Sequence, residues 1–156
     1  MKSLIALCSL LALPMLISPP ALCADDPVIK GTTTYIDGGV YKPLDGVQVT
    51  VFRKAPAGSD TSRSGGKFGV QFAAGTPVNV LFDGPEGLLP QLQSLSADKD
   101  VKHDVHVTLF TIEEAKRLRI DAYAYVKAII DQLVAAGVRE SSEELGRLRT
   151  LLNKLG

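Results

Sequence analysis

The sequence contains two histidines, His103 and His106, the residue type best suited to bind a metal or move a proton near neutral pH. Both lie in segment 101–109, where apolar and polar residues alternate as in a β-strand. Successive side chains of a strand leave opposite faces, so a spacing of three prevents the two imidazoles from sharing a metal ion. The sequence therefore predicts structural roles for both histidines.

Other residues with reactive or metal-binding side chains are also scattered. Serines lie in segments expected to be loops or helix caps, and none stands in a nucleophile motif such as Gly-x-Ser-x-Gly. Aspartates recur at turns, whereas calcium requires six to eight converging oxygens. We therefore expect no catalytic residue, no metal, no cofactor and no enzymatic activity.

Residues 1–24 have the parts of a secretory signal peptide: a basic start at Lys2, an apolar run over Leu4–Ile17 and a small-residue exit at Ala24. The run is shorter than the roughly 20 apolar residues that a membrane-spanning helix needs. We expect cleavage after Ala24 and a periplasmic or secreted protein with no membrane span. Lipidation at Cys23 is the alternative, although Leu22 is larger than the residue such a signal favours.

Cleavage would remove both cysteines, Cys8 and Cys23, and with them any disulfide or thiolate metal site. The full chain has 17 basic and 17 acidic residues, so loss of Lys2 leaves a formal charge of −1. The basic residues form no cluster of the kind that binds nucleic acid or anionic lipid. We expect neither partner.

Residues 28–110 show the two-residue hydrophobic period of half-buried strands. The clearest alternating runs are 47–52, 68–72, 78–82 and 101–109, and turn residues occur at 37–39, 45–46, 65–66, 75–77 and 83–85. Short strands separated by such turns are typical of an all-β sandwich or barrel.

From Thr111 onward the hydrophobic period changes to three and four residues, which predicts helices. Thr111–Glu114 fits a capping box, Gly137 fits a helix end, and Ser141–Glu144 fits a second capping box. The pattern predicts a C-terminal α-helical hairpin over residues 111–156. Its first helix would have about 25 residues and a length of roughly 37 Å.

The apolar arc of this first helix covers about half of its circumference, more than the ~100° that one neighbour needs. One interpretation is that it packs on the second helix and on one sheet of the sandwich. The other is that it packs on the second helix and on another protein molecule, with Tyr123, Ile130 and Val134 as contacts.

Segment 83–92 carries three leucines, Leu88, Leu89 and Leu92, among residues typical of loops. They either close one end of the sandwich or form a patch that binds a partner, since loops often carry recognition.

The run Pro43-Leu44-Asp45-Gly46-Val47, with Gly31-Thr32-Thr33 before it and Gly66-Lys67-Phe68 after it, resembles the carboxypeptidase regulatory-like (transthyretin-like) domain family. This resemblance covers residues 28–110 and implies a prealbumin-like sandwich of about seven strands with a non-catalytic interaction role. Two positions depart from the family pattern: Thr33 replaces a core aliphatic residue, and Gly65 replaces a frequent acidic residue.

Together these features predict an exported, non-enzymatic binding or assembly module that contacts an envelope protein or itself. The alternative is a carbohydrate- or peptidoglycan-binding module. Such modules favour exposed aromatic residues, and this chain has no Trp and four tyrosines.

Overall fold

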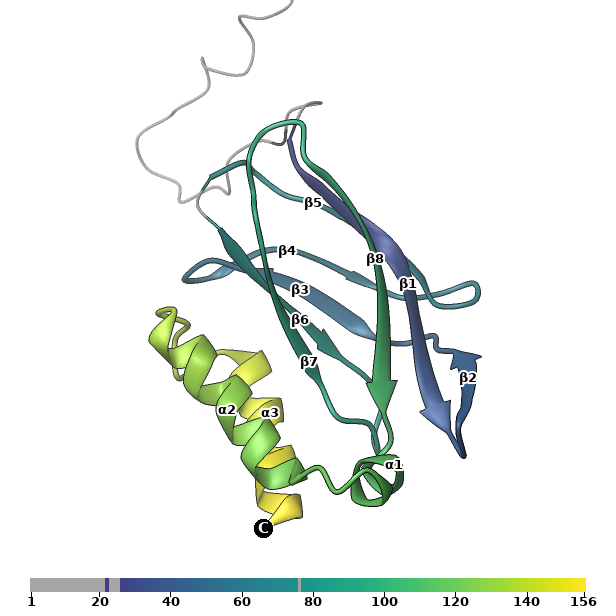
Figure 1. The fold of residues 1–156 in the computed structure, drawn as a ribbon. Coiled ribbons are helices and arrows are strands. Elements are labelled where there is room, and N and C mark those ends of the chain that lie inside the picture. The colour runs from purple at the N-terminus through teal and green to yellow at the C-terminus, as the bar shows by residue number, and fades with distance from the viewer. Residues whose placement is uncertain (1–21, 23–25, 76) are drawn as a thin grey trace, which may run out of the picture.

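The computed structural model describes Leu22, residues 26–75 and residues 77–156, so the predicted leader, its cleavage at Ala24 and Cys23 lie outside the described residues. Two four-stranded sheets face each other, and a pair of helices lies along the outer face of one of them (Figure 1). The predicted β-sandwich with a C-terminal helical hairpin is therefore confirmed.

The strands are β1 Val28–Asp37, β2 Val40–Pro43, β3 Gln48–Phe52, β4 Pro56–Thr61, β5 Lys67–Gln71, β6 Val78–Asp83, β7 Gln91–Leu95 and β8 Lys102–Phe110. The helices are α1 Ile112–Arg117, α2 Ala122–Ala135 and α3 Glu143–Leu155. The described residues thus contain eight strands where the sequence indicated about seven.

Strand β1 is the centre of the first sheet, called sheet A here. It pairs in parallel with β8 over nearly its whole length, from Val28 opposite Lys102 to Ile36 opposite Phe110. On its other side it pairs antiparallel first with β5 and then with β2. The second sheet, sheet B, has the order β4-β3-β6-β7 with antiparallel neighbours throughout.

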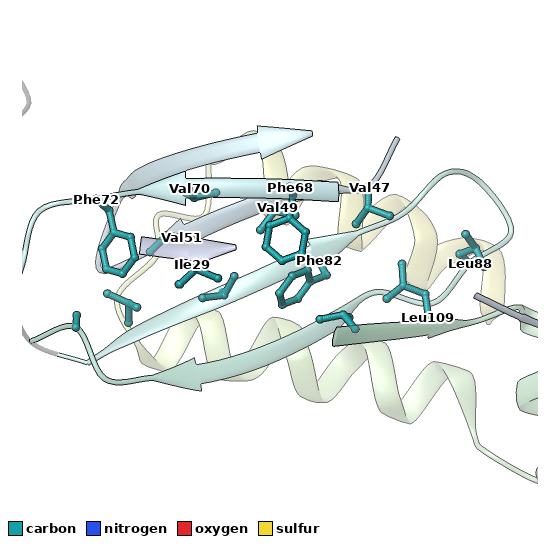
Figure 2. Close-up of a cluster of buried hydrophobic side chains, with 14 residues drawn as sticks. Ile29, Val47, Val49, Val51, Phe68, Val70, Phe72, Phe82, Leu88 and Leu109 are labelled. Carbon is teal, nitrogen blue, oxygen red and sulfur yellow. The ribbon is translucent and has the colours of Figure 1, made fainter. Parts of the chain in front are cut away.

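Apolar side chains from the inner faces of both sheets form the first core, as Figure 2 shows. The rings of Phe68 and Phe82 meet edge to face there, with centroids 5.6 Å apart. The other buried members are Ile29, Val47, Val49, Val51, Val70, Phe72, Val78, Val80, Leu88, Ala97, Val107 and Leu109. The alternating runs predicted from sequence supply most of this core.

A second core lies between the outer face of sheet B and the helices. Phe52 and Leu81 leave sheet B on that face, and each is fully buried. They pack in one cluster with the buried face of α2, which comprises Val126, Ile129, Ile130 and Leu133. The wide apolar arc of the predicted helix is therefore explained by a second helix and a sheet of the same chain.

The prediction of one 25-residue helix is wrong, because the chain breaks between α1 and α2. Arg119 has a left-handed φ of +58°, and the Ile120 amide donates to the Ala115 carbonyl, which closes α1. Asp121 then caps α2 by accepting a hydrogen bond from the Ala124 amide. As a result, α2 has 14 residues, and Leu118 is exposed instead of lying on the apolar stripe.

The predicted helix caps are correct at Thr111 and displaced by one residue at α3. The Thr111 hydroxyl accepts from the Glu114 amide at 3.0 Å, although the Glu114 carboxylate binds Arg117 instead of reaching back. At α3 the N-cap is Ser142, whose hydroxyl accepts from the Leu145 amide. This register turns Leu145 into the second core, where it is fully buried.

Three strands lack the alternation of apolar and polar residues from which the other strands were predicted. Strand β2 is exposed at all four positions, and β4 contains Gly58 and Ser59. Strand β7 begins inside segment 83–92, which was expected to be a loop, so Leu92 belongs to a strand.

The two residues that depart from the family pattern, Thr33 and Gly65, both form hydrogen bonds at the contact between segment 43–47 and the 65–67 turn. Thr33 is fully buried, and its hydroxyl lies 2.6 Å from the Leu44 carbonyl oxygen and 3.1 Å from that of Gly66. On the other side of this turn, the Asp45 carboxylate accepts hydrogen bonds from the amides of Gly65 and Gly66. The hydrogen bonds of Thr33, Gly65 and Gly66 therefore connect the 43–47 segment to the 65–67 turn.

A substitution at Gly31 tests the close parallel pairing of β1 and β8. A Cβ atom added at Gly31 would lie 1.8 Å from the backbone oxygen of Val105, so the strands would have to move apart. We expect Gly31→Ala to lower the free energy of unfolding by at least about 2 kcal/mol, as overpacking does. Urea unfolding followed by circular dichroism measures the change.

Gly69→Ala is the matched control, because Gly69 pairs with β1 opposite Lys30 and an added Cβ meets its nearest atom at 3.9 Å. We expect it to be close to neutral. Equal destabilisation by the two variants would contradict the close approach at Gly31.

Candidate functional site

A groove of about 810 Å³ lies between the loop that follows β6 and the outward face of α3. The loop side contributes Asp83, Gly84, Pro85, Glu86, Gly87 and Leu88, the helix side contributes Glu143, Gly146, Arg147, Thr150, Leu151, Lys154 and Leu155, and Ile112 of α1 completes the lining. The volume falls in the range of about 300–1,000 Å³ typical of ligand sites. Of the six partner contacts predicted from sequence, Leu88 alone lines the groove, and the helical wall comes from α3 instead of the first predicted helix.

The loop that forms one wall is held by backbone hydrogen bonds. The Leu88 amide donates to Pro85, and the Leu89 amide donates to Phe110 at 2.8 Å. The Ile112 amide in turn donates to the Gly87 carbonyl, so the start of α1 is fixed against the loop. The wall therefore has a defined shape.

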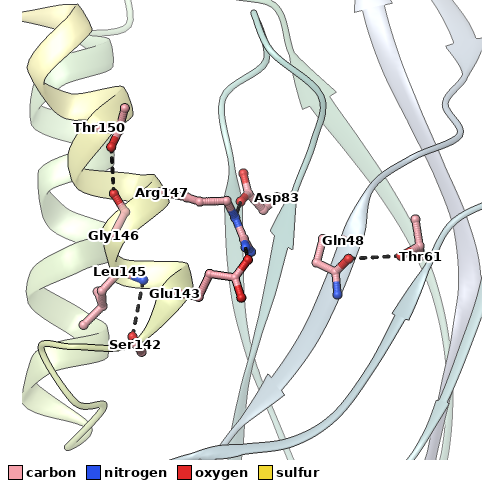
Figure 3. A network of polar contacts seen from close by, with 9 residues as sticks. All are labelled: Gln48, Thr61, Asp83, Ser142, Glu143, Leu145, Gly146, Arg147 and Thr150. Atoms are coloured by element: carbon pink, nitrogen blue, oxygen red, sulfur yellow. Dashed lines mark hydrogen bonds and ion pairs between the residues drawn. The ribbon is translucent and has the colours of Figure 1, made fainter.

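Two ion pairs join the walls across the groove. Arg147 of α3 lies 2.9 Å from Asp83, and Lys154 of the same helix lies 2.8 Å from Glu86. Arg147 also contacts Glu143 one turn earlier at 2.9 Å, as Figure 3 shows. Seven residues separate the two cations, which corresponds to about 10 Å along a helix. Leu151 lies between the two cations on the helix, and Leu88 and Leu155 also line the groove.

Negative charge exceeds positive charge at the Arg147 end of the groove. Burial alone would lower the pKa of Arg147, but the hydrogen bond to Asp83 and the charges of Asp83, Glu143 and Glu144 raise it above its ordinary value. The two carboxylates of Asp83 and Glu143 thus contact one guanidinium, so this end of the groove carries one negative charge more than it has cations.

Gly146 leaves room on the helical wall. A Cβ atom added there would have no heavy atom within 4 Å, and its backbone has no left-handed φ that would require glycine. Thr150, one turn later, donates its hydroxyl to the Gly146 carbonyl, so its side chain lies against the helix backbone. The groove is therefore open beside Gly146.

The predicted partner contacts differ in how much of each side chain is accessible. Leu88 and Leu89 are 9% and 2% exposed and belong to the first and the second core respectively, so they leave little surface for a partner. Ile130 is 6% exposed and belongs to the second core, because it faces the rest of the hairpin and sheet B. Leu92 is half-buried in the same cluster. Tyr123 and Val134 remain accessible, at 43% and 38%.

The histidines occupy opposite faces of β8, as their spacing predicts. The His103 imidazole contacts the Ser96 carbonyl at 2.9 Å, and the His106 imidazole contacts the Thr32 hydroxyl at 2.7 Å. Across residues 26–75 and 77–156, no three His, Asp or Glu side chains gather as a metal site. None of the helices described is both long enough and apolar enough to cross a bilayer.

Sequence reasoning missed the polar residues of the groove. Glu143, Arg147 and Lys154 recur at spacings of four and seven on the side of α3 away from the second core. This periodicity is readable in the sequence, but it is also typical of any solvated helix face. Arg147 and Lys154 differ from ordinary exposed helix residues because they pair with the loop after β6, which lies more than 60 residues earlier in the chain.

Comparisons with known proteins give only distant likenesses. No family model matches the chain, and no curated protein matches it. Among solved structures, a minor pilin of the Gram-positive pathogen Streptococcus agalactiae is 15% identical with a TM-score of 0.48, over 56% of this chain and 45% of the pilin chain. A 9R-lipoxygenase from Cyanothece is 12% identical with a TM-score of 0.37, over 56% of this chain and 16% of the enzyme chain.

The chain thus spans less than half the length of either structure that it resembles. Likenesses at this level carry no argument about function. The resemblance to the carboxypeptidase regulatory-like family is confirmed only as far as the β-sandwich itself.

The Lys154–Glu86 pair across the groove can be tested by titration. The hydrogen bond from Lys154, followed by its charge, holds the pKa of Glu86 below its ordinary value of 4.5. The pair's contribution to stability is therefore complete above about pH 4.5 and is lost as the pH falls through the lowered pKa. We expect an NMR titration of the Glu86 carboxyl to give a midpoint below 4.5.

In the Lys154→Ala variant the Glu86 midpoint should rise toward the ordinary value, and high salt should shift it in the same direction in the wild type. A midpoint that does not change in Lys154→Ala would show that the two walls are not joined there.

Proposed function

We propose that the protein is an exported, non-enzymatic binding module whose groove accepts a short segment of a partner protein. The groove itself carries this proposal: it has an apolar lining from the half-buried residues Ile112, Leu151 and Leu155 and charged residues along both walls. Apolar anchors set in a polar rim are the usual anatomy of a protein-binding site. Export is proposed from the leader pattern of residues 1–24.

The charges of the groove define the chemistry of the segment. The Asp83–Arg147–Glu143 end has more carboxylates than cations, so a Lys or Arg of the partner would be attracted there. The groove of about 810 Å³ is large enough for a side chain of leucine or tyrosine size, and Leu151 and Leu155 line it. We therefore propose that the segment carries an apolar residue next to a basic residue.

The carbohydrate-binding alternative has less support from the arrangement of tyrosines. Tyr41 and Tyr123 are exposed, but they lie on β2 and α2, which belong to different layers of the molecule (Figure 1). Tyr35 is packed against the first core and Tyr125 against the second. No two tyrosines of the described residues form a joint platform on which a sugar would stack.

Selection from a displayed library of random heptapeptides tests the proposed groove function. We expect the selected peptides to combine an aromatic or aliphatic residue with an adjacent Lys or Arg. Gly146→Leu, which places a side chain in the groove, should weaken their binding about tenfold or more, as loss of an anchor pocket does. Isothermal titration of synthetic peptides measures the change.

Asn153→Leu is the matched control, because Asn153 is exposed on the same helix and does not line the groove. It should leave peptide affinity unchanged. Peptides that bind Gly146→Leu as well as the wild type, or a library that yields no binder, would contradict the groove as the binding site.

A further inference from the structure

Strand β8 is a sheet edge with one unpaired side. It pairs with β1, and among the described residues no strand pairs with it on the other side (Figure 1). The Val28 amide donates to the Val101 carbonyl, so the odd-numbered residues of this segment direct their backbone groups toward β1. The even-numbered residues from Lys102 to Thr108 direct theirs away from the sheet. Such a row of unpaired amides and carbonyls is a template for a further strand.

The other sheet edges are short or irregular, and β8 is neither. Strand β2 has four residues, β5 and β7 have five each, and β4 begins at a proline and has a register shift in its pairing with β3. Strand β8 has nine residues, no proline and a continuous register with β1. Its remaining protection is the charge of its exposed residues Lys102, Asp104 and His106. Charges of both signs disfavour an arbitrary strand and favour one whose charges are complementary.

The acidic and the basic group at the middle of this edge are available to a partner. The Asp104 carboxylate forms no hydrogen bond or ion pair with any described residue, although Lys30 lies opposite it on β1. The His106 imidazole contacts the Thr32 hydroxyl through Nδ1 at 2.7 Å, and no described residue contacts its Nε2. Both side chains lie on the outer face of sheet A, two positions apart.

We propose that β8 pairs antiparallel with β8 of a second copy of this chain, about a two-fold axis at Val105. In this register Asp104 of each copy lies opposite His106 of the other, and Lys102 lies opposite Thr108. The backbone groups of these four residues all point outward, so each opposite pair exchanges its amide and carbonyl hydrogen bonds. The pairing uses no residue of the groove, so it goes beyond the proposed function.

The alternative registers oppose like groups or pair less of the strand. An axis at Asp104 places two carboxylates opposite each other, and an axis at His106 places two imidazoles opposite each other, which destabilises a strand pair. An axis at His103 brings Lys102 opposite Asp104 but leaves most of β8 without a partner. The axis at Val105 also brings together two half-buried apolar side chains that pack against the first core of each copy.

Sedimentation velocity of two complementary charge variants tests the inference, at about pH 6, where most imidazole side chains carry a charge. Asp104→Lys places the introduced lysine opposite His106 of the other copy, and His106→Glu places the introduced glutamate opposite Asp104. Each substitution acts twice in a symmetric dimer, so we expect each to raise the dissociation constant about tenfold or more. An equimolar mixture should form heterodimers, because both opposite pairs then again combine an acid with a base.

A cysteine at the axis tests the register. The Cα atoms of a non-hydrogen-bonded antiparallel pair lie about 4.5 Å apart, a distance that a disulfide can span. We expect Val105→Cys to give a covalent dimer on oxidation, with the disulfide mapped to position 105 by mass spectrometry. Thr108→Cys is the matched control, because Thr108 lies opposite Lys102 in this register and should not cross-link.

Lys67→Glu is the control for the charge variants. Lys67 is exposed on the outer face of sheet A, but it lies on β5, on the side of β1 away from β8. This variant should dimerise like the wild type. Circular dichroism should show all three charge variants folded, because the substituted side chains are exposed.

A wild type that stays monomeric at high concentration would overturn the inference, and so would a mixture of the two charge variants that forms no dimer. Cross-linking through Thr108→Cys but not through Val105→Cys would overturn the register. Gly146→Leu should leave this dimer intact, so failure of strand pairing and failure of the groove function are separate results.

Discussion

The burial of β6 on both faces is the constraint on which the rest of the structure depends. Val80 and Phe82 point into the space between the sheets, Leu81 points the other way, and all three are fully buried. Burying a Leu or Phe side chain contributes about 1.5–3 kcal/mol. A two-sheet sandwich alone would leave Leu81 and Phe52 in water, so sheet B requires a second layer, and α2 and α3 provide it.

The groove is a consequence of this second layer. With Leu145 and Leu148 turned into the second core, the face of α3 that carries Arg147 and Lys154 lies beside the loop after β6. The acids of that loop then pair with these cations, and an apolar channel remains between the two walls. Sheet A has no helix on its outer face among the described residues, which leaves the β1–β2 hairpin free at its edge (Figure 1).

Two helix ends show how much of this could be read from the sequence. Both α1 and α2 close with the same pair of backbone hydrogen bonds and a left-handed residue, Arg119 in one and Gly137 in the other. The glycine predicts its helix end. An arginine in the same conformation costs free energy, which the packing of Ala115 and Ile120 with the second core helps to offset. The break at Leu118 was therefore invisible to periodicity. The strands of the first core were predictable, because alternation of apolar and polar residues places one set of side chains on the buried face of a strand. The groove was not predictable, because it depends on a contact between Asp83 and Arg147, which are 64 residues apart in the sequence.

We infer that the helical hairpin and the sandwich are one cooperative unit, joined through Leu81 and Phe52. Native-state hydrogen exchange measures this directly, because it gives an opening free energy for each amide. The account predicts that the slowest amides of α2 and of β6 open with the same free energy and respond equally to denaturant. Amides of α2 that exchange by a separate, much less costly opening while β6 stays protected would show that the hairpin is an appendage and that the groove has no fixed wall.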